Sequence, residues 1–155
     1  AAFESFSGFI HEQLKFFYIN GTKDKIDFPI RYKEKVHKKY KKEKGKTDYF
    51  YEDLSWFLDN KAISEQEFQF LLQIRELRGK FVHEMSTCIY NGISKELKDK
   101  HIELIRLYQK INAWWVKNIE ISINSSFLTD IENTNVKNLE IVFLELLEKI
   151  AIENI

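Results

Sequence analysis

The sequence predicts an all-α protein, an up-and-down bundle of five or six helices in a single domain over residues 1–155. Apolar residues recur at helical spacing along most of the chain. Alternation typical of a strand occurs only in one short run, residues 119–124, and one short strand cannot form a sheet alone. A chain of 155 residues can bury roughly 70% of its unfolded surface in one core. The fold therefore needs no covalent or metal staple.

The N-terminal part of the chain predicts three helices, which span residues 2–20, 29–44 and 48–59. Gly21 ends the first helix, because glycine readily follows a last helical turn. Pro29 suits the first turn of the second helix, where its missing N–H costs nothing, and Gly45 ends that helix. The third helix would bury four apolar side chains, those of Phe50, Leu54, Trp56 and Phe57.

The remaining chain predicts three more helices, over residues 65–90, 95–118 and 136–153. Ser64 is the expected N-cap of the first, and Glu67 three residues later completes a capping box. Ser94 is the expected N-cap of the second helix. The run 119–124 is expected to be a helix end or an extended connection.

Charge is unevenly distributed although the formal net charge is zero. Residues 31–46, called the basic segment below, hold nine Lys or Arg against two Glu, whereas residues 119–155 hold two Lys against seven acidic residues. Tyr32 and Tyr40 lie among the cations, a composition that suits a phosphate backbone and stacked bases. The candidate phosphate-binding residues are Lys38, Lys39, Lys41 and Lys42. The alternative is a solvated helix whose lysines only keep it in water.

Several classes of protein are disfavoured by composition. No apolar run approaches the roughly 18 residues of a membrane span, and no signal-like segment begins the chain. A single cysteine, Cys88, excludes an internal disulfide, and neither cysteine-based zinc spacing nor a His-Glu-x-x-His motif occurs. We therefore expect a cytoplasmic protein with no membrane, metal or cofactor requirement.

One short chemical constellation stands out, Arg78 and His83, which are separated by four residues inside a helical pattern. His83 points about 120° away from Leu77, which belongs to the apolar stripe, so it is not expected in the core. Gly79, one turn before, leaves room beside it. Histidine can take and give a proton near neutral pH, and a guanidinium can hold two phosphoryl oxygens. On one helix, however, residues five apart point about 140° away from each other and lie about 7.5 Å apart along the axis.

The segment Glu76-Leu77-Arg78-Gly79-Lys80-Phe81-Val82-His83-Glu84 resembles the signature of the HEPN superfamily of helical domains. The resemblance implies a metal-independent endoribonuclease of toxin or antiviral-defence type. In such a protein His83 would be the acid–base group and Arg78 would hold the phosphoryl oxygens. It also implies a homodimer that joins two copies of the motif around one cleft, and an antitoxin or other regulatory protein as a possible partner. Arg75 and Lys80 would add affinity for RNA.

The residue after the arginine departs from the family pattern. Active members commonly carry Asn, Asp or His there, and this chain has Gly79. The alternative is therefore an inactive HEPN-like module that binds nucleic acid, nucleotide or a protein partner, with the basic segment providing contact. Gly79 also permits close approach of a partner helix in a symmetric dimer.

Overall fold

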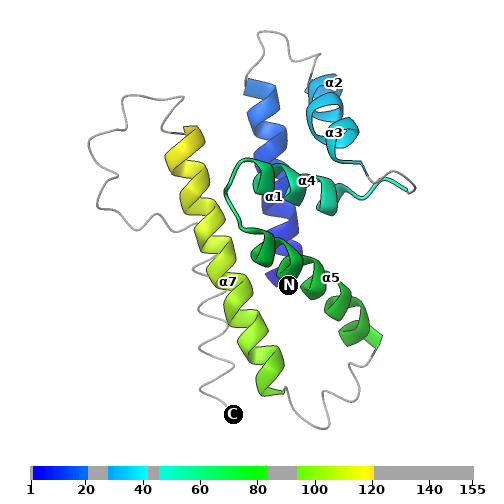
Figure 1. The fold of residues 1–155 in the computed structure, drawn as a ribbon, viewed down its shortest axis with the longest axis vertical. Coiled ribbons are helices and arrows are strands. Elements are labelled where there is room, and N and C mark those ends of the chain that lie inside the picture. Colours follow the sequence, from blue (N-terminus) through cyan, green and yellow to red (C-terminus); the bar gives the residue numbers. More distant parts are fainter. Residues whose placement is uncertain (1, 21–27, 42–45, 84–93, 121–155) are drawn as a thin grey trace. The chain divides into compact units, whose positions relative to one another are not determined.

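The computed structural model describes residues 2–20, 28–41, 46–83 and 94–120. All regular elements in these residues are helices, and none of them is a strand, so the predicted all-α class is confirmed (Figure 1). The chain divides into two compact units, one from Phe3 to Arg75 and one from Glu76 onward. The single domain predicted over residues 1–155 stays a prediction.

Helix α1 (Ala2–Asn20) has the predicted bounds. Its apolar stripe is buried, and Phe6, Ile10 and Leu14 are fully inaccessible. These positions are four residues apart, so they lie on one face of the helix. Phe6 contacts Phe50 of the same unit, with ring centres 6.4 Å apart.

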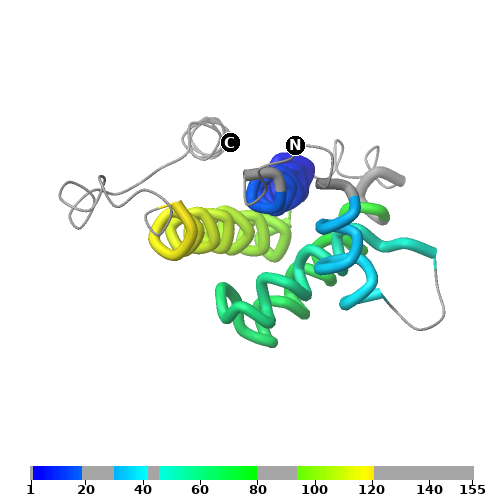
Figure 2. Tube along the Cα trace, turned by 90° about the horizontal axis from the view of Figure 1, so that it is seen from above, coloured from blue at the N-terminus to red at the C-terminus, as the bar shows by residue number. Residues whose placement is uncertain are grey.

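The basic segment begins in a helical stretch of three parts, α2 (Phe28–Tyr32), the π-helix η2 (Lys33–His37) and α3 (Lys38–Tyr40). Pro29 lies in the first turn, as predicted. The π-helix was not predicted, and the helix ends four residues earlier than expected, because Lys41 adopts an extended backbone. Both η2 and α3 pack against α4, an arrangement visible in Figures 1 and 2. Residues 42–45, including the predicted stop Gly45, lie outside the described residues.

Helix α4 (Tyr49–Asp59) confirms the third prediction. The side chain of Asp48 caps it by accepting a hydrogen bond from the backbone N–H of Tyr51 at 3.2 Å. The predicted apolar side chains are buried, apart from a half-buried Phe50. Two neighbouring acidic side chains, Glu52 and Asp53, are also buried, each only 1% exposed, and the apolar periodicity gave no expectation of this.

Helix α5 (Glu65–His83) begins with the predicted capping box. The Glu67 N–H donates to the Ser64 hydroxyl at 3.3 Å, and the Ser64 N–H donates to the Glu67 carboxylate at 2.8 Å. Its N-terminal part belongs to the first unit and buries Phe68, Leu71 and Ile74. The helix then continues without a break through Gly79, and the predicted extension to residue 90 lies outside the described residues.

The second unit contains α7 (Lys95–Trp115) and the π-helix η3 (Val116–Glu120). Ser94 caps α7 as predicted, because its hydroxyl accepts the Leu97 N–H at 3.3 Å. The strand-like run at residue 119 starts inside η3, so the expectation of a helix end holds for its described part. The helix predicted over residues 136–153 lies outside the described residues.

Candidate functional site

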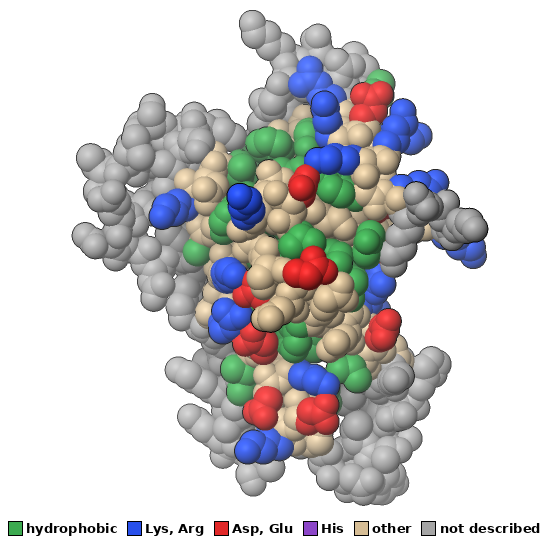
Figure 3. Space-filling model, viewed as in Figure 1, with side chains coloured by type: hydrophobic (Ala, Val, Ile, Leu, Met, Phe, Trp, Pro, Cys, Tyr) green, Lys and Arg blue, Asp and Glu red, His purple; other side chains and the backbone are tan. Residues whose placement is uncertain are grey.

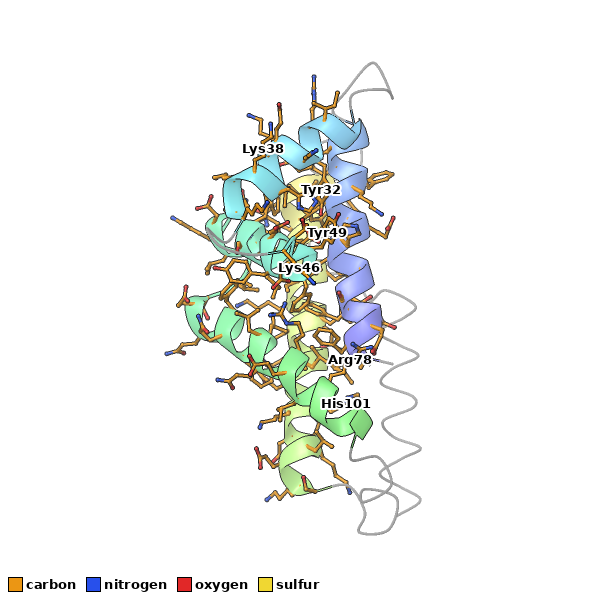
Figure 4. The ribbon with its side chains drawn as sticks, turned by 90° about the vertical axis from the view of Figure 1, so that its right-hand side faces the viewer. Tyr32, Lys38, Lys46, Tyr49, Arg78 and His101 are labelled. Carbon is orange, nitrogen blue, oxygen red and sulfur yellow. The ribbon has the colours of Figure 1, made fainter. Side chains whose placement is uncertain are left out.

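The Arg78–His83 motif lies on α5, whose continuity supplies the geometry on which the prediction depends. The Arg78 side chain is exposed, and Figure 4 labels it on this helix. Gly79 is exposed too, and a Cβ added there would meet no atom within 4 Å. The side chains of Lys80 and His83 lie outside the described part. On an uninterrupted α-helix Arg78 and His83 leave the axis about 140° apart, so one helix does not bring their side chains together.

Arg75, a predicted substrate-binding residue, is already engaged in the first unit. Its Nη1 donates to both carboxylate oxygens of Asp48, at 2.7 and 2.9 Å, and its guanidinium lies 5.6 Å from the centre of the Phe50 ring. Since Asp48 is the N-cap of α4, this contact ties α5 to the start of α4. Binding of a phosphate by Arg75 stays a prediction and would compete with this contact.

Two of the predicted phosphate-binding lysines form exposed ion pairs. Lys38 lies 3.8 Å from Glu34, and Lys39 donates to Asp59 at 2.6 Å. The hydrogen bond between Lys39 and Asp59 raises the pKa of the lysine and lowers the pKa of the carboxyl. Exposed pairs of this kind contribute little to stability. Both lysines can therefore exchange their carboxylate partners for phosphates at small cost.

The rest of the basic segment gives a cationic surface on the α2–α3 stretch. In Figure 3 Lys and Arg side chains gather over this stretch in the upper part of the view. Val36 points inward and is fully buried, whereas the cations around it are exposed. The exposed cations on this stretch are Arg31, Lys33, Lys35, Lys38 and Lys39. Lys41 and Lys46, which follow it in the basic segment, are exposed as well. Lys42 lies outside the described residues.

Beneath this surface the structure brings together polar side chains that the sequence did not identify as a group. They are His11, Tyr32, His37, Glu52 and Asp53, called the histidine–carboxylate cluster below. The members come from α1, α2, η2 and α4, and all of them belong to the first unit.

Asp53 accepts two hydrogen bonds through its two carboxylate oxygens. Tyr32 donates its hydroxyl to Oδ1 at 2.5 Å, and Nδ1 of His11 lies 2.8 Å from Oδ2. The same Nδ1 lies 3.0 Å from the Tyr32 hydroxyl oxygen. With its proton on Nδ1, His11 donates to both the Asp53 carboxylate and the Tyr32 hydroxyl oxygen. The Tyr32 hydroxyl in turn donates to Asp53, so every group has a hydrogen-bond partner. Burial and the neighbouring Asp53 charge raise the pKa of the Tyr32 phenol, so it remains a donor.

Glu52 repeats this arrangement with the second histidine. One of its oxygens pairs with Nδ1 of His37, and the other accepts the backbone N–H of Asp48 at 3.3 Å. Two adjacent carboxylates of α4 therefore hold one histidine from α1 and one from η2. A buried carboxylate needs hydrogen-bond donors of this kind to offset the loss of its hydration.

Two tyrosine rings connect the histidines. The centre of the Tyr32 ring lies 5.6 Å from that of His11 and 4.8 Å from that of His37. The Tyr49 ring lies 5.9 Å and 4.5 Å from the same two imidazoles. Figure 4 shows Tyr32 and Tyr49 close together, with Lys38 above and Lys46 below them in that view. Both imidazoles therefore adjoin the same pair of tyrosines.

One signal in the sequence could have revealed this cluster. Asp53 lies three residues after Phe50 and four before Phe57, which places a carboxylate on the apolar stripe of its own helix. A carboxylate at such a position needs a buried partner. Nothing in the sequence identifies His11 and Tyr32 as that partner, because they are 42 and 21 residues away from it.

No described helix combines the length and apolar character needed to cross a membrane. Among the described residues, no three His, Cys, Asp or Glu side chains are grouped so that they could hold a metal ion. Comparison of the chain with family models, curated proteins and solved structures finds no match. Three features of the chain itself therefore characterise this protein. They are an all-α fold, a cationic helical surface and a buried histidine–carboxylate cluster.

Proposed function

We propose that this protein is a metal-independent endoribonuclease of toxin or antiviral-defence type, with a composite site formed by Arg78 and His83 across a homodimer. The observation that carries the proposal is that the motif occupies one uninterrupted helix with an exposed Arg78. Space beside Gly79 supports it further, because nothing described in the chain fills the position of a Cβ there.

The chemistry assigned to the two residues requires no metal. His83 takes the proton of the ribose 2′-hydroxyl as that oxygen attacks phosphorus. The P–O5′ bond breaks, and the protonated His83 returns a proton to the departing O5′. Arg78 holds the phosphoryl oxygens, which gather negative charge in the transition state. The products are a 5′-hydroxyl and a 2′,3′-cyclic phosphate. Since the two side chains diverge on one helix, each site takes its arginine from one chain and its histidine from the other.

The test is cleavage of a mixed RNA pool in EDTA by the wild-type protein, Arg78→Ala and His83→Ala. We expect each substitution to lower the rate by about 100-fold or more, because each removes one role in the transition state. Arg106→Ala and His101→Ala on α7 are matched controls: Arg106 is exposed and paired with Glu103, and His101 is half-buried. Light scattering should show dimers for every variant.

Mixing the two inactive variants tests the composite site directly. A dimer of one Arg78→Ala chain and one His83→Ala chain keeps one site with both residues intact. After subunit exchange about a quarter of the wild-type rate should therefore return. No recovery, in dimers shown to have exchanged, would contradict a site shared between chains.

The second candidate is an inactive HEPN-like module that binds nucleic acid, and the exposed lysines of the basic segment favour it. In that case the wild-type protein binds RNA without cleaving it. Its affinity then falls steeply with salt, and Lys41→Ala weakens binding to all RNA sequences alike. Absence of wild-type cleavage together with such binding would replace the first proposal by this one.

A further inference from the structure

The two histidines of the cluster are oriented in the same way. All the pairing of His11 and His37 with described residues is at Nδ1. Because a carboxylate only accepts, Nδ1 carries the proton, and the neutral imidazole then has its lone pair on Nε2. A buried carboxylate that fixes a histidine in this tautomer prepares Nε2 to take a proton from a substrate.

The two histidines are the part of their carboxylate pairs that solvent reaches. The side chain of His11 is 28% exposed and that of His37 is 14% exposed, whereas the carboxylates behind them are 2% and 1% exposed. Nδ1 of each ring faces its buried carboxylate, so Nε2, on the far side of the ring, is the atom that would meet a substrate.

The π-helix η2 places His37 next to Tyr32. On an α-helix, residues five apart point about 140° away from each other, so Tyr32 and His37 would not meet. A π-turn forms hydrogen bonds between residues five apart and therefore aligns such positions. The rings of Tyr32 and His37 are accordingly in contact, with centres 4.8 Å apart. Single π-turns recur at functional sites, and this one places a second carboxylate-held histidine next to the first.

The surroundings indicate a phosphate ester of a nucleotide. Tyr49 adjoins both imidazoles and is itself 55% exposed, so a nucleobase can stack on its ring. Lys33 and Lys35 extend into solvent from the same π-helix that carries His37, and Lys46 is exposed two residues before the cap of α4. These exposed cations supply positive charge that a phosphate group requires.

We propose that His11 and His37 form an acid–base site that hydrolyses 2′,3′-cyclic phosphate ends of RNA. The identity of the substrate rests on the proposed function, since cleavage by a 2′-hydroxyl leaves such an end. One imidazole takes a proton from water through Nε2 while the water oxygen bonds to phosphorus. The bond from phosphorus to one ribose oxygen breaks, and the other imidazole, protonated at Nε2, gives its proton to that oxygen. The reaction consumes one water and leaves a phosphate monoester, with no redox change and no metal.

The test uses cytidine 2′,3′-cyclic monophosphate in EDTA, with conversion to the monoester followed by ³¹P NMR. We expect turnover by the wild-type protein, with a bell-shaped pH profile because one histidine must be neutral and the other charged. His11→Ala and His37→Ala should each lose about 100-fold in rate. His101→Ala is the matched control and should retain full activity. Added imidazole should restore part of the rate of His11→Ala, whereas a purely structural histidine would give no such rescue.

This experiment separates the present inference from the proposed function. Arg106→Ala, which lies outside both sites, should hydrolyse the cyclic nucleotide at the wild-type rate. Loss of hydrolysis in Arg78→Ala or His83→Ala, with full activity in His11→Ala and His37→Ala, would assign the reaction to the Arg78–His83 site and overturn the inference. Absence of hydrolysis by the folded wild-type protein overturns the acid–base site and leaves the Arg78–His83 proposal untouched. Hydrolysis that EDTA abolishes also overturns it, because histidines backed by carboxylates are the arrangement that metal ligands use.

Discussion

The Arg78–His83 motif and the histidine–carboxylate cluster differ in how their chemistry is held. In the motif, an exposed arginine extends from α5. In the cluster, three elements are tied to two carboxylates of α4 that are almost inaccessible. An exposed arginine can be changed without disturbing the fold, whereas a buried network cannot. The comparison therefore predicts large effects on stability in the cluster and small ones at the motif.

Asp53→Ala should give the largest effect on stability. The substitution leaves the Tyr32 hydroxyl without its acceptor and Nδ1 of His11 without its carboxylate partner. Breaking a buried pair of this kind typically costs 3–5 kcal/mol, and we expect about 3 kcal/mol because His11 is partly exposed. Urea unfolding followed by circular dichroism measures this difference.

Asp59→Ala is the matched control for Asp53→Ala. Asp59 ends the same helix and pairs with Lys39, but it is exposed. Its removal should leave the urea midpoint almost unchanged. Equal losses for Asp53→Ala and Asp59→Ala would show that burial of the cluster contributes nothing to the fold.

Tyr32→Phe should have an intermediate effect that depends on pH. At neutral pH the lost hydrogen bond to Asp53 should cost about 1.5 kcal/mol. The pKa of the Tyr32 phenol is raised in the folded protein by burial and by Asp53. The stabilisation is therefore complete below the unfolded pKa, near 10, and is lost as the pH rises toward the higher folded value.

The stability difference between wild type and Tyr32→Phe should accordingly shrink by about 1.4 kcal/mol for each pH unit above about pH 10. Urea unfolding of both proteins between about pH 9 and about pH 11 gives this slope. A difference that stays constant over that range would mean that the Tyr32 phenol ionises equally in the folded and unfolded states.

Local signals explain which parts of the fold the sequence could predict. The caps at Ser64 and Ser94 and the buried face of α4 depend on neighbours within one or two turns, and they were found. The π-turn that carries His37 was missed, because the contacts that favour it are made with α4, at Glu52. The pairing of His11 with Asp53 is tertiary for the same reason. The sequence thus offered the Arg78–His83 candidate, which is local, and missed the histidine–carboxylate cluster, which exists only after folding.

Gly79→Ala should have the smallest effect on stability and the opposite sign. Glycine inside a helix costs up to about 1 kcal/mol relative to alanine, and a Cβ at this position meets no atom within 4 Å. The folded chain should therefore gain about 0.5–1 kcal/mol in its free energy of unfolding. Gly8→Ala in α1 is the matched control, because a Cβ there also meets nothing within 4 Å.

Gly79→Ala is most informative when its resistance to urea and its dimerisation are both measured and compared. If a partner helix approaches closely at Gly79 in the proposed homodimer, the added methyl group holds the two helices apart. The variant should then unfold at higher urea and yet dissociate at higher protein concentration than Gly8→Ala, with RNA cleavage reduced in proportion to the dimer lost. A more stable variant with unchanged dimerisation and cleavage would place the dimer interface on another face and reject a composite site next to Gly79. The same result would leave the histidine–carboxylate cluster unaffected, because its residues lie in the other unit of the chain.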